Sequence, residues 1–448
     1  MLPGQFSTAI NSVFKTPLIV GEAIGYFTNT QPTAPYRGAG RPDATYAIER
    51  IIDVAASELG IDPMELRRRN IIPAAAMPYK SPFLVEYDCG EFERNMAKAA
   101  ELAEYEGFDK RLADSQRRGR LRGIGVANPI EIAAGPLDRL STDYAKIRAN
   151  ADGTVTLFSG AMSVGQGLET ALSTIVSERL GLSLNQIRYV QGDTGLVPKG
   201  KGNGGSAALT LGGSAVTIGV DALLEKARHL ASEELEASPL DVEYSSGQFR
   251  VMGSDHSVSL AALAESLSQT GDERSGYLEG SGQFGQVQPT YPNGCHICEV
   301  EIDPDTGSTV VVNYVSVEDV GRVLNPLLLE GQIHGGVVQG IGQALLEQVC
   351  FDDSAQLLSG SFMDYGMPRA DNVPSIVSET LEVPTALNPL GVKGVGEAGT
   401  VGALASTMNA VCHALLPLGV RHFDMPATPY RIWKSIQDAQ NTCCKSDI

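Results

Sequence analysis

Four segments of the sequence place polar residues between or beside glycines, directly ahead of a stretch that is typical of a helix. They are Pro35–Pro42, Gly165–Gly167, Gly202–Ser206 and Gly394–Gly399. The start of a helix offers unpaired N–H groups and the positive end of the helix dipole, and glycine lets the backbone approach an anion closely. Four such loops in one chain indicate a large polyanionic cofactor that several loops surround. None is a P-loop or a dinucleotide-binding G-x-G-x-x-G with its strand and acidic partner.

Glu397 has the clearest capacity for chemistry, because it lies between small residues just before the apolar stretch Val401–Leu416. A carboxylate at the start of a helix commonly serves only as a cap or a partner of the helix dipole. An accessible carboxylate beside a cofactor can instead act as a general base. The residues alone leave both interpretations open. Gln166 and Gln332 have the default interpretation of polar residues at the starts of helices.

The segment Cys295-His296-Ile297-Cys298 has the C-x-x-C spacing of a redox or zinc site. A zinc site needs a second Cys or His pair at suitable spacing, and the sequence offers none. We therefore expect an ordinary strand with incidental cysteines and no metal held by protein ligands. The seven cysteines are scattered and odd in number, which is not a disulfide framework and indicates a reducing, cytoplasmic compartment.

The elements that must position these residues follow from hydrophobic periodicity and from stop signals. We expect helices over 42–60, 63–69, 91–106, 168–181, from the 202–206 loop to about 233, 330–348 and 400–416. We expect strands over 141–149, 154–159, 187–191 and 376–382 and within 297–317, with a hairpin at Asn150–Gly153. The three arginines Arg67–Arg69 are expected to be a solvated helix end. The pattern predicts an α+β fold with a boundary near 110–120.

Composition excludes several classes of protein. With 34 Lys and Arg against 53 Asp and Glu the net charge is −19, so a nucleic-acid partner is not expected. The chain has 43% hydrophobic and 19% charged residues, which is typical of a globular protein. No apolar run approaches the ~20 residues of a membrane span, and the first residues lack the pattern of a secretion signal.

Several long motifs occur in an order that resembles the molybdenum hydroxylase family, which comprises xanthine dehydrogenases, aldehyde oxidases and aerobic carbon monoxide dehydrogenases. They are PYRGAGRPDATYAIERIIDVAASELGIDPMELRRRNIIP, GQGLETAL, GNGGSAALTLGGSAV, NPLLLEGQIHGGVVQGIGQALLE, GVKGVGEAGTVGA and HFDMPATPYRIW. The resemblance covers about residues 1–435 and corresponds to the C-terminal half or so of the molybdopterin-binding large subunit. It implies mixed sheets with flanking helices. It also implies the end of a first molybdopterin-binding domain over 1–115, a second over 116–436 and a polar tail over 437–448.

The resemblance also implies a role for each matching residue. Glu397 matches the family's general base, in a centre whose molybdenum is held by the pterin dithiolene and by no protein ligand. Gln166, between Gly165 and Gly167, matches a glutamine near the metal and pterin, and Gln332 matches a second one. The remaining matches are expected to contact the cofactor; they are Arg37, Gly38, Ala39, Gly204, Gly205, Ser206, Lys393 and Gly396. For Lys393 a surface role is an equal alternative.

Departures from the family are also informative. Gly38 stands where the carbon monoxide enzymes have a copper-binding cysteine, which disfavours that activity. Ala39 stands where xanthine-type enzymes have an aromatic residue, which implies a roomier pocket. The family's upstream half, the cysteine sets for [2Fe–2S] clusters and a flavin domain do not occur in this sequence. We therefore expect three partners: an iron–sulfur subunit, an FAD subunit and a companion chain with the N-terminal half of the large subunit.

The expected activity is insertion of water-derived oxygen into a C–H bond of an N-heterocycle or aldehyde. The cofactor is expected to be the cytosine dinucleotide form of molybdopterin, because the motifs resemble those of bacterial three-subunit relatives. Two alternatives remain. One is a non-catalytic remnant or assembly partner that keeps the fold, and the other is a binding module for a phosphate ligand.

Overall fold

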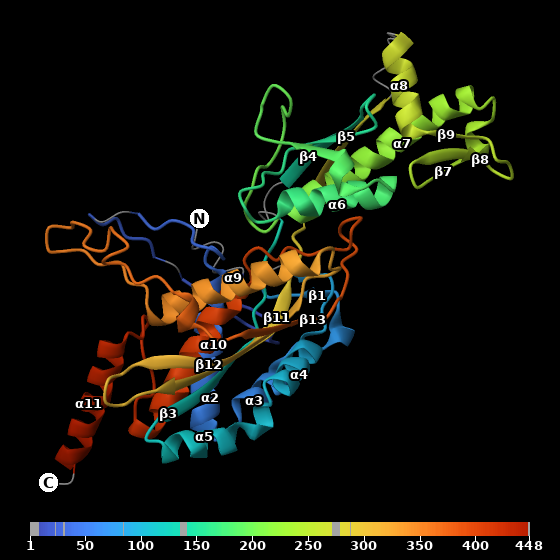
Figure 1. The fold of residues 1–448 in the computed structure, drawn as a ribbon. Coiled ribbons are helices and arrows are strands. Elements are labelled where there is room, and N and C mark those ends of the chain that lie inside the picture. The colour runs from blue at the N-terminus through green and yellow to red at the C-terminus, as the bar shows by residue number, and fades with distance from the viewer. Residues whose placement is uncertain are drawn as a thin grey trace.

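The computed structural model describes residues 9–22, 24–29, 32–83, 85–134, 141–270, 278–286 and 288–446. These form two parts, one built by residues 141–286 and one by the segments on either side (Figure 1). Each part contains a four-stranded mixed sheet with helices packed on it. This arrangement confirms the predicted α+β class.

The larger part contains the sheet β13-β12-β11-β3, in which β12 and β13 are parallel and the other pairs antiparallel. Helix α10 covers one face of this sheet, and α4 packs on β11 and β12. The helices and strands of this part are α2 (Arg41–Leu59), α3 (Pro63–Asn70), β1 (Tyr79–Lys80), β2 (Glu86–Tyr87), α4 (Phe92–Leu102), α5 (Phe108–Arg117), β3 (Leu121–Ala127), β11 (Asn293–Ile302), β12 (Thr309–Asp319), α9 (Pro326–Leu345), β13 (Ile376–Thr380), α10 (Ala398–Leu415) and α11 (Pro429–Ser446).

The smaller part contains the sheet β10-β4-β5-β6, with α7 packed on β10 and β4. Its elements are β4 (Ser141–Ala149), β5 (Val155–Ser159), α6 (Leu168–Leu180), β6 (Ile187–Val190), the π-helical turn η4 (Ala208–Gly213), α7 (Ser214–Glu234), β7 (Val242–Ser245), β8 (Gln248–Val251), β9 (Ser257–Ser259), α8 (Leu260–Thr270) and β10 (Glu279–Gln286). The antiparallel pairing of β4 with β5 confirms the predicted hairpin.

Most predicted elements are present within a few residues, and the differences have local causes. The region 297–317 forms two antiparallel strands, β11 and β12, joined by the turn signal Asp303–Gly307. The predicted helix 330–348 begins earlier, at Pro326, because the side chain of Asn325 accepts a hydrogen bond from the N–H of Leu328. Residues 437–446, expected in a polar tail, continue helix α11.

The expectation that Arg67–Arg69 form a solvated helix end is wrong for Arg67. Its side chain is fully buried, and it lies 2.6 Å from Glu49 and 2.8 Å from Asp53, both on α2. Arg69 does lie in solvent, with its side chain 57% exposed. One turn of α3 thus presents an arginine to the interior, where carboxylates of α2 compensate its charge.

Two helices, 208–234 and 398–418, reach the length and hydropathy of a membrane span, although no apolar run of that length was expected from the sequence. In their most apolar windows 61% and 78% of the residues are buried inside the protein. Both helices are apolar because they pack against the two sheets in the interior of the protein.

Helices α9 and α10 approach each other closely at Gly336. A Cβ atom at Gly336 would lie 2.9 Å from the backbone nitrogen of Thr400, whereas a Cβ at Gly331 on the same helix would meet nothing within 4 Å. We expect Gly336→Ala to lower the melting temperature of the chain, because the two helices must separate. Gly331→Ala is the matched control, which should be neutral or slightly stabilising since alanine favours the helix. Equal melting temperatures for the two variants would contradict this packing.

Candidate active site

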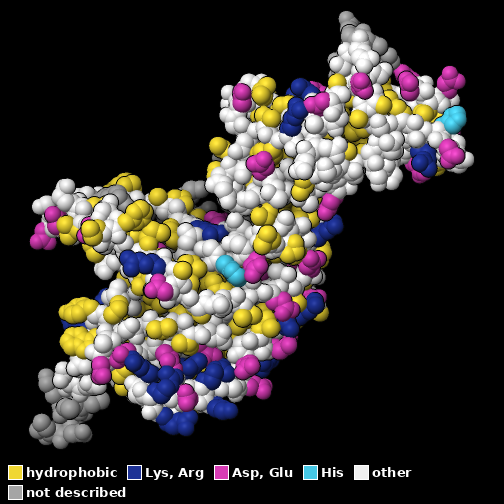
Figure 2. Space-filling model, in the orientation of Figure 1, with side chains coloured by type: hydrophobic (Ala, Val, Ile, Leu, Met, Phe, Trp, Pro, Cys, Tyr) yellow, Lys and Arg dark blue, Asp and Glu magenta, His cyan; other side chains and the backbone are white. Residues whose placement is uncertain are grey.

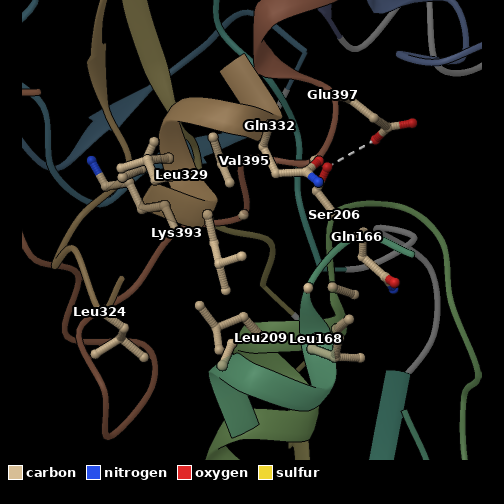
Figure 3. Close-up of a pocket in the computed structure, with 18 of the residues that line it drawn as sticks. Gln166, Leu168, Ser206, Leu209, Leu324, Leu329, Gln332, Lys393, Val395 and Glu397 are labelled. Carbon is tan, nitrogen blue, oxygen red and sulfur yellow. Dashed lines mark hydrogen bonds between the residues drawn. The ribbon is translucent and has the colours of Figure 1, made fainter. Parts of the chain in front are cut away.

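A cavity of about 510 Å³ lies between the two parts of the protein (Figure 3). Among its lining residues are Arg37, Gly165–Leu168, Asn203–Leu209, Val320, Arg322–Asn325, Gln332 and Lys393–Glu397. A cavity of this size suits a small-molecule ligand. All four glycine-containing loops predicted from the sequence contribute to the wall, so the fold brings them to one place.

Glu397 occupies the N-cap position of α10, but its side chain makes no capping hydrogen bond. Its Oε1 accepts a hydrogen bond from the N–H of Gly38 at 3.1 Å. Its Oε2 accepts from Arg41 Nη2 at 2.9 Å and from Ser206 Oγ at 3.1 Å (Figure 3). Of the two interpretations of Glu397, capping by its side chain is therefore wrong. Three donors from two segments, Pro35–Pro42 and Gly202–Ser206, hold the carboxylate at the cavity wall with its side chain 14% exposed.

Arg37 holds the loop Gly394–Gly399 at the residue directly before Glu397. Its Nε donates to the carbonyl oxygen of Gly396 at 2.5 Å, and its Nη1 donates to Gln339 Oε1 at 2.9 Å. Its Nη2 donates to both the carbonyl and the side-chain oxygen of Gln332. Burial lowers the pKa of the Arg37 guanidinium, while the nearby carboxylates Glu131 and Glu397 act in the opposite direction. Arg37 and Gln332 thus position each other and the residue before Glu397.

Gln166 lies on the other side of the cavity, on the loop ahead of α6 (Figure 3). Its amide nitrogen donates to the carbonyl of Met162 and its oxygen accepts from the N–H of Val164, so the side chain stabilises its own loop. Lys393 also lines the cavity, but its Nζ lies 2.5 Å from Asp319 Oδ2 with both side chains fully buried. The surface alternative for Lys393 is therefore wrong.

Two loops have backbone conformations that suit an anion. Gly38, Ala39 and Gly40 have φ values of 102°, 49° and 93°. Gly204, Gly205 and Ser206 have φ values of 140°, 62° and 50°. In the first loop the N–H of Gly38 donates to Glu397 and the N–H of Ala39 donates to the carbonyl of Tyr36 at 2.8 Å, so this loop holds the carboxylate of Glu397. A non-glycine residue with positive φ, such as Ala39 or Ser206, is a local strain that is found mainly at functional sites.

Sequence reasoning missed Arg41, Gln339 and Glu131. Arg41 donates to Glu397, to the carbonyl of Ile132 at 2.5 Å and to the carbonyl of Gly38 at 2.8 Å. It stands one helical turn after Arg37 in the motif PYRGAGRP, and that spacing could have identified it. Glu131 has no motif around it and could not have been found this way.

The C-x-x-C segment lies in strand β11, where Cys295 and Cys298 are buried, and this confirms the predicted strand. Its His296 is hydrogen-bonded to Tyr314 at 2.7 Å and to Glu318 at 2.6 Å inside the core. Within the described residues, no group of three or more His, Cys, Asp or Glu side chains could hold a metal ion.

Comparison with known proteins identifies the family. Residues 98–374 and 1–71 match two models described as molybdopterin cofactor-binding domains. The chain belongs to the molybdenum hydroxylase family. This chain is 35% identical to the 6-hydroxypseudooxynicotine dehydrogenase complex subunit gamma of Paenarthrobacter nicotinovorans. The match covers 95% of this chain and 54% of that subunit. The chain is also 33% identical to the carbon monoxide dehydrogenase large chain of Hydrogenophaga pseudoflava, over 92% of this chain and 53% of that one.

Among solved structures, the quinoline 2-oxidoreductase of Pseudomonas putida 86 superposes with a TM-score of 0.89 at 32% identity. The match covers 97% of this molybdenum hydroxylase chain and 57% of the solved one. The chain thus spans about half the length of the relatives that it matches.

The residues of the cavity fit a pterin cofactor with phosphate groups. Glycine loops line the cavity from both parts of the protein, and the side chains of Leu168, Leu209, Leu324 and Leu329 add apolar surface to its wall (Figure 3). The cavity wall has one carboxylate, Glu397, and three cationic residues, Arg37, Arg322 and Lys393. Local groups can therefore hold an anion in a chain whose net charge is −19.

Proposed function

We propose that this chain forms the C-terminal part of the molybdopterin-binding subunit of a molybdenum hydroxylase. The enzyme would oxidise a C–H bond of an N-heterocycle or an aldehyde, with oxygen derived from water. The observation that carries this proposal is the Glu397 carboxylate, which three donors from two segments hold at the wall of the glycine-lined cavity. This arrangement suits a general base better than a cap.

When bound, the molybdenum–pterin group would supply the two-electron redox chemistry. The protein's part is to place a base and to hold the cofactor. Oε1 of Glu397 accepts one hydrogen bond and Oε2 accepts two, so Oε1 has more free capacity to take up a proton. Arg37 and Gln332 would orient the metal end of the cofactor. The loops Gly165–Gly167 and Gly204–Ser206 would bind the pterin and its phosphate, and Gly38, Ala39, Lys393 and Gly396 would complete the contacts.

The N-heterocycle is the substrate class that we favour. Relatives of this chain are named nicotine 6-hydroxylase and quinoline 2-oxidoreductase, and both names contain a nitrogen heterocycle. Other relatives are named carbon monoxide dehydrogenase. Gly38 has no thiol to hold the copper that the carbon monoxide enzymes require, so we do not propose that activity for this chain.

The proposed enzyme needs partners, and one surface of the chain supports this. Large apolar side chains are exposed within the described residues 15–22 and 24–29 and within 349–367, and they include Leu18, Tyr26, Phe27, Phe362 and Met363. The arm on the left of Figure 2 carries many of these hydrophobic groups. Exposed apolar patches commonly mark protein contacts. We propose that a companion half of the large subunit covers them and that iron–sulfur and FAD subunits receive the electrons.

We also propose that the cofactor is the cytosine dinucleotide form, and that the chain divides near residue 115 into two cofactor-binding domains. The family matches at 1–71 and 98–374 support such a division. The cytoplasm is the proposed compartment, and the five cysteines whose side chains the structure describes are all free thiols.

The test is purification of the chain with a companion N-terminal half, followed by analysis for molybdenum and for CMP released by acid. We expect about one molybdenum and one CMP per complex. Molybdenum absent from every complex that contains this chain would rule out the catalytic proposal and favour a remnant or assembly partner. Phosphate ligand without molybdenum would favour the binding module.

A further inference from the structure

Glu131 is a buried carboxyl group that the proposed mechanism does not use. It lies beyond β3, on a segment that runs along residues 290–293, and its N–H donates to the carbonyl of Pro292 at 2.8 Å. The residue is 1% exposed. Neither carboxyl oxygen has a hydrogen-bond partner within the described part of the chain. A buried carboxylate without donors is strongly disfavoured in its charged form.

The cationic groups near Glu131 donate their hydrogen bonds to other acceptors. The charged groups around it are Arg41 on α2, Arg37 ahead of α2 and Glu397 ahead of α10. Arg41 already pairs with Glu397 at 2.9 Å and donates to the carbonyls of Gly38 and Ile132. Each nitrogen of Arg37 donates to Gly396, Gln332 or Gln339. Both guanidinium groups near Glu131 are therefore hydrogen-bonded to other acceptors, and neither donates to its carboxyl group.

We propose that Glu131 is a positioning residue that stays protonated behind Glu397, so that the pair carries a single negative charge on Glu397. This inference rests on the proposed function in one respect, which is that Glu397 is the general base. A neutral Glu131 can donate its O–H toward Ser206 or Glu397 and so help to keep the base in place, with no second charge to repel it. Burial and the charge of Glu397 raise the pKa of Glu131 well above its ordinary value, and Arg41 opposes this shift.

A protonated and an ionised Glu131 predict different pH dependences for the stability of Glu131→Gln relative to the wild type. If folding raises the pKa of Glu131, the folded chain binds an extra proton above the ordinary pKa of a glutamate. The free energy of unfolding of the wild type then falls as pH rises between the unfolded and the raised folded pKa. Glutamine resembles the neutral acid in shape and has no such dependence. The stability of Glu131→Gln relative to the wild type must therefore increase from pH 5 toward pH 8.

The experiment is thermal unfolding of the full chain and of Glu131→Gln between pH 5 and pH 8, without cofactor. We expect the melting temperature of Glu131→Gln minus that of the wild type to rise by about 2 °C or more over this range. The matched control is Glu299→Gln, which removes a fully buried glutamate that lies 2.5 Å from Arg111 and 2.7 Å from Arg122. Glu299→Gln should lower the melting temperature by a similar amount at every pH in this range, because its pairs with Arg111 and Arg122 are lost.

Infrared spectroscopy supplies a second measurement on the wild type. A neutral buried acid has a carbonyl band that carboxylates lack, and this band should be present at neutral pH and absent from Glu131→Gln. A flat or falling stability difference, a Glu131→Gln chain that does not fold at neutral pH, or a missing band would each overturn the proposal. None of these measurements needs molybdenum, so their failure is distinct from failure of the proposed function.

Discussion

The substitution Glu397→Gln is expected to lower kcat of the assembled, molybdenum-loaded complex by about 10²- to 10⁴-fold, which is the usual contribution of a general base. The single oxygen of glutamine can accept from Arg41 and Ser206 in the place of Oε2, whereas the amide nitrogen replaces Oε1 and the bond from Gly38 is lost. We expect the remaining contacts to keep the loop and the cofactor in place, while the variant loses the capacity to take up a proton. The measurements are steady-state turnover and the molybdenum content of the same preparation.

The control for this prediction is Glu330→Gln. Glu330 is a carboxylate of α9 with its side chain 56% exposed and lies outside the cavity wall. Its turnover should match that of the wild type. A Glu397→Gln enzyme that keeps its molybdenum and loses less than about tenfold in kcat would refute the assignment of the base.

The substitution Arg67→Met has the largest expected effect on stability. Arg67 is fully buried, and it pairs with Glu49 and Asp53 and donates to the carbonyl of Val126 at 3.0 Å. Removal of one partner from a buried ion pair leaves an uncompensated charge, which costs about 3–5 kcal/mol. We expect a loss of this size in the free energy of unfolding, measured by urea denaturation at pH 7.

The pH dependence of Arg67→Met follows from Glu49. Burial raises the pKa of the Glu49 carboxyl, and Arg67 opposes that shift. Without Arg67 the pKa of Glu49 rises further, so Glu49 becomes protonated as pH falls toward 5. The difference in the free energy of unfolding between the wild type and Arg67→Met should therefore become smaller at lower pH. Arg69→Met on the same helix turn is the control. Its exposed pair with Glu65 should contribute little. A similar loss in both variants would contradict the buried network.

The sequence predicted the elements better than the contacts between them. Helix α2 was predicted because Pro42, a periodic apolar face and Gly60 mark its start and its end within the local sequence. The glycine loops were predicted for the same reason, since each is a local pattern. Arg67 was misplaced because the same local pattern describes a solvated arginine and a buried one. Only the packing of α3 on α2 decides between them.

The sequence predicted many of the residues that line the cavity but not the contacts among them, and their roles toward a cofactor stay predictions. Family motifs identified Arg37 and Glu397, yet nothing local shows that Gly38 donates to Glu397 or that Arg37 bonds to Gly396. Glu131 was invisible, because a lone glutamate in an apolar segment has no pattern. Its significance depends on charges contributed by α2 and by the loop before α10, which lie far from it in the sequence.

The bond between Gly38 and Glu397 joins residues that are 359 positions apart. At a synthesis rate of about 5–20 residues per second, roughly 20–70 s separate their emergence from the ribosome. Until residue 397 has been synthesised, Arg41 and Ser206 lack the carboxylate to which they both donate. The contacts that join the loops Pro35–Pro42, Gly202–Ser206 and Gly394–Gly399 therefore cannot form before that point.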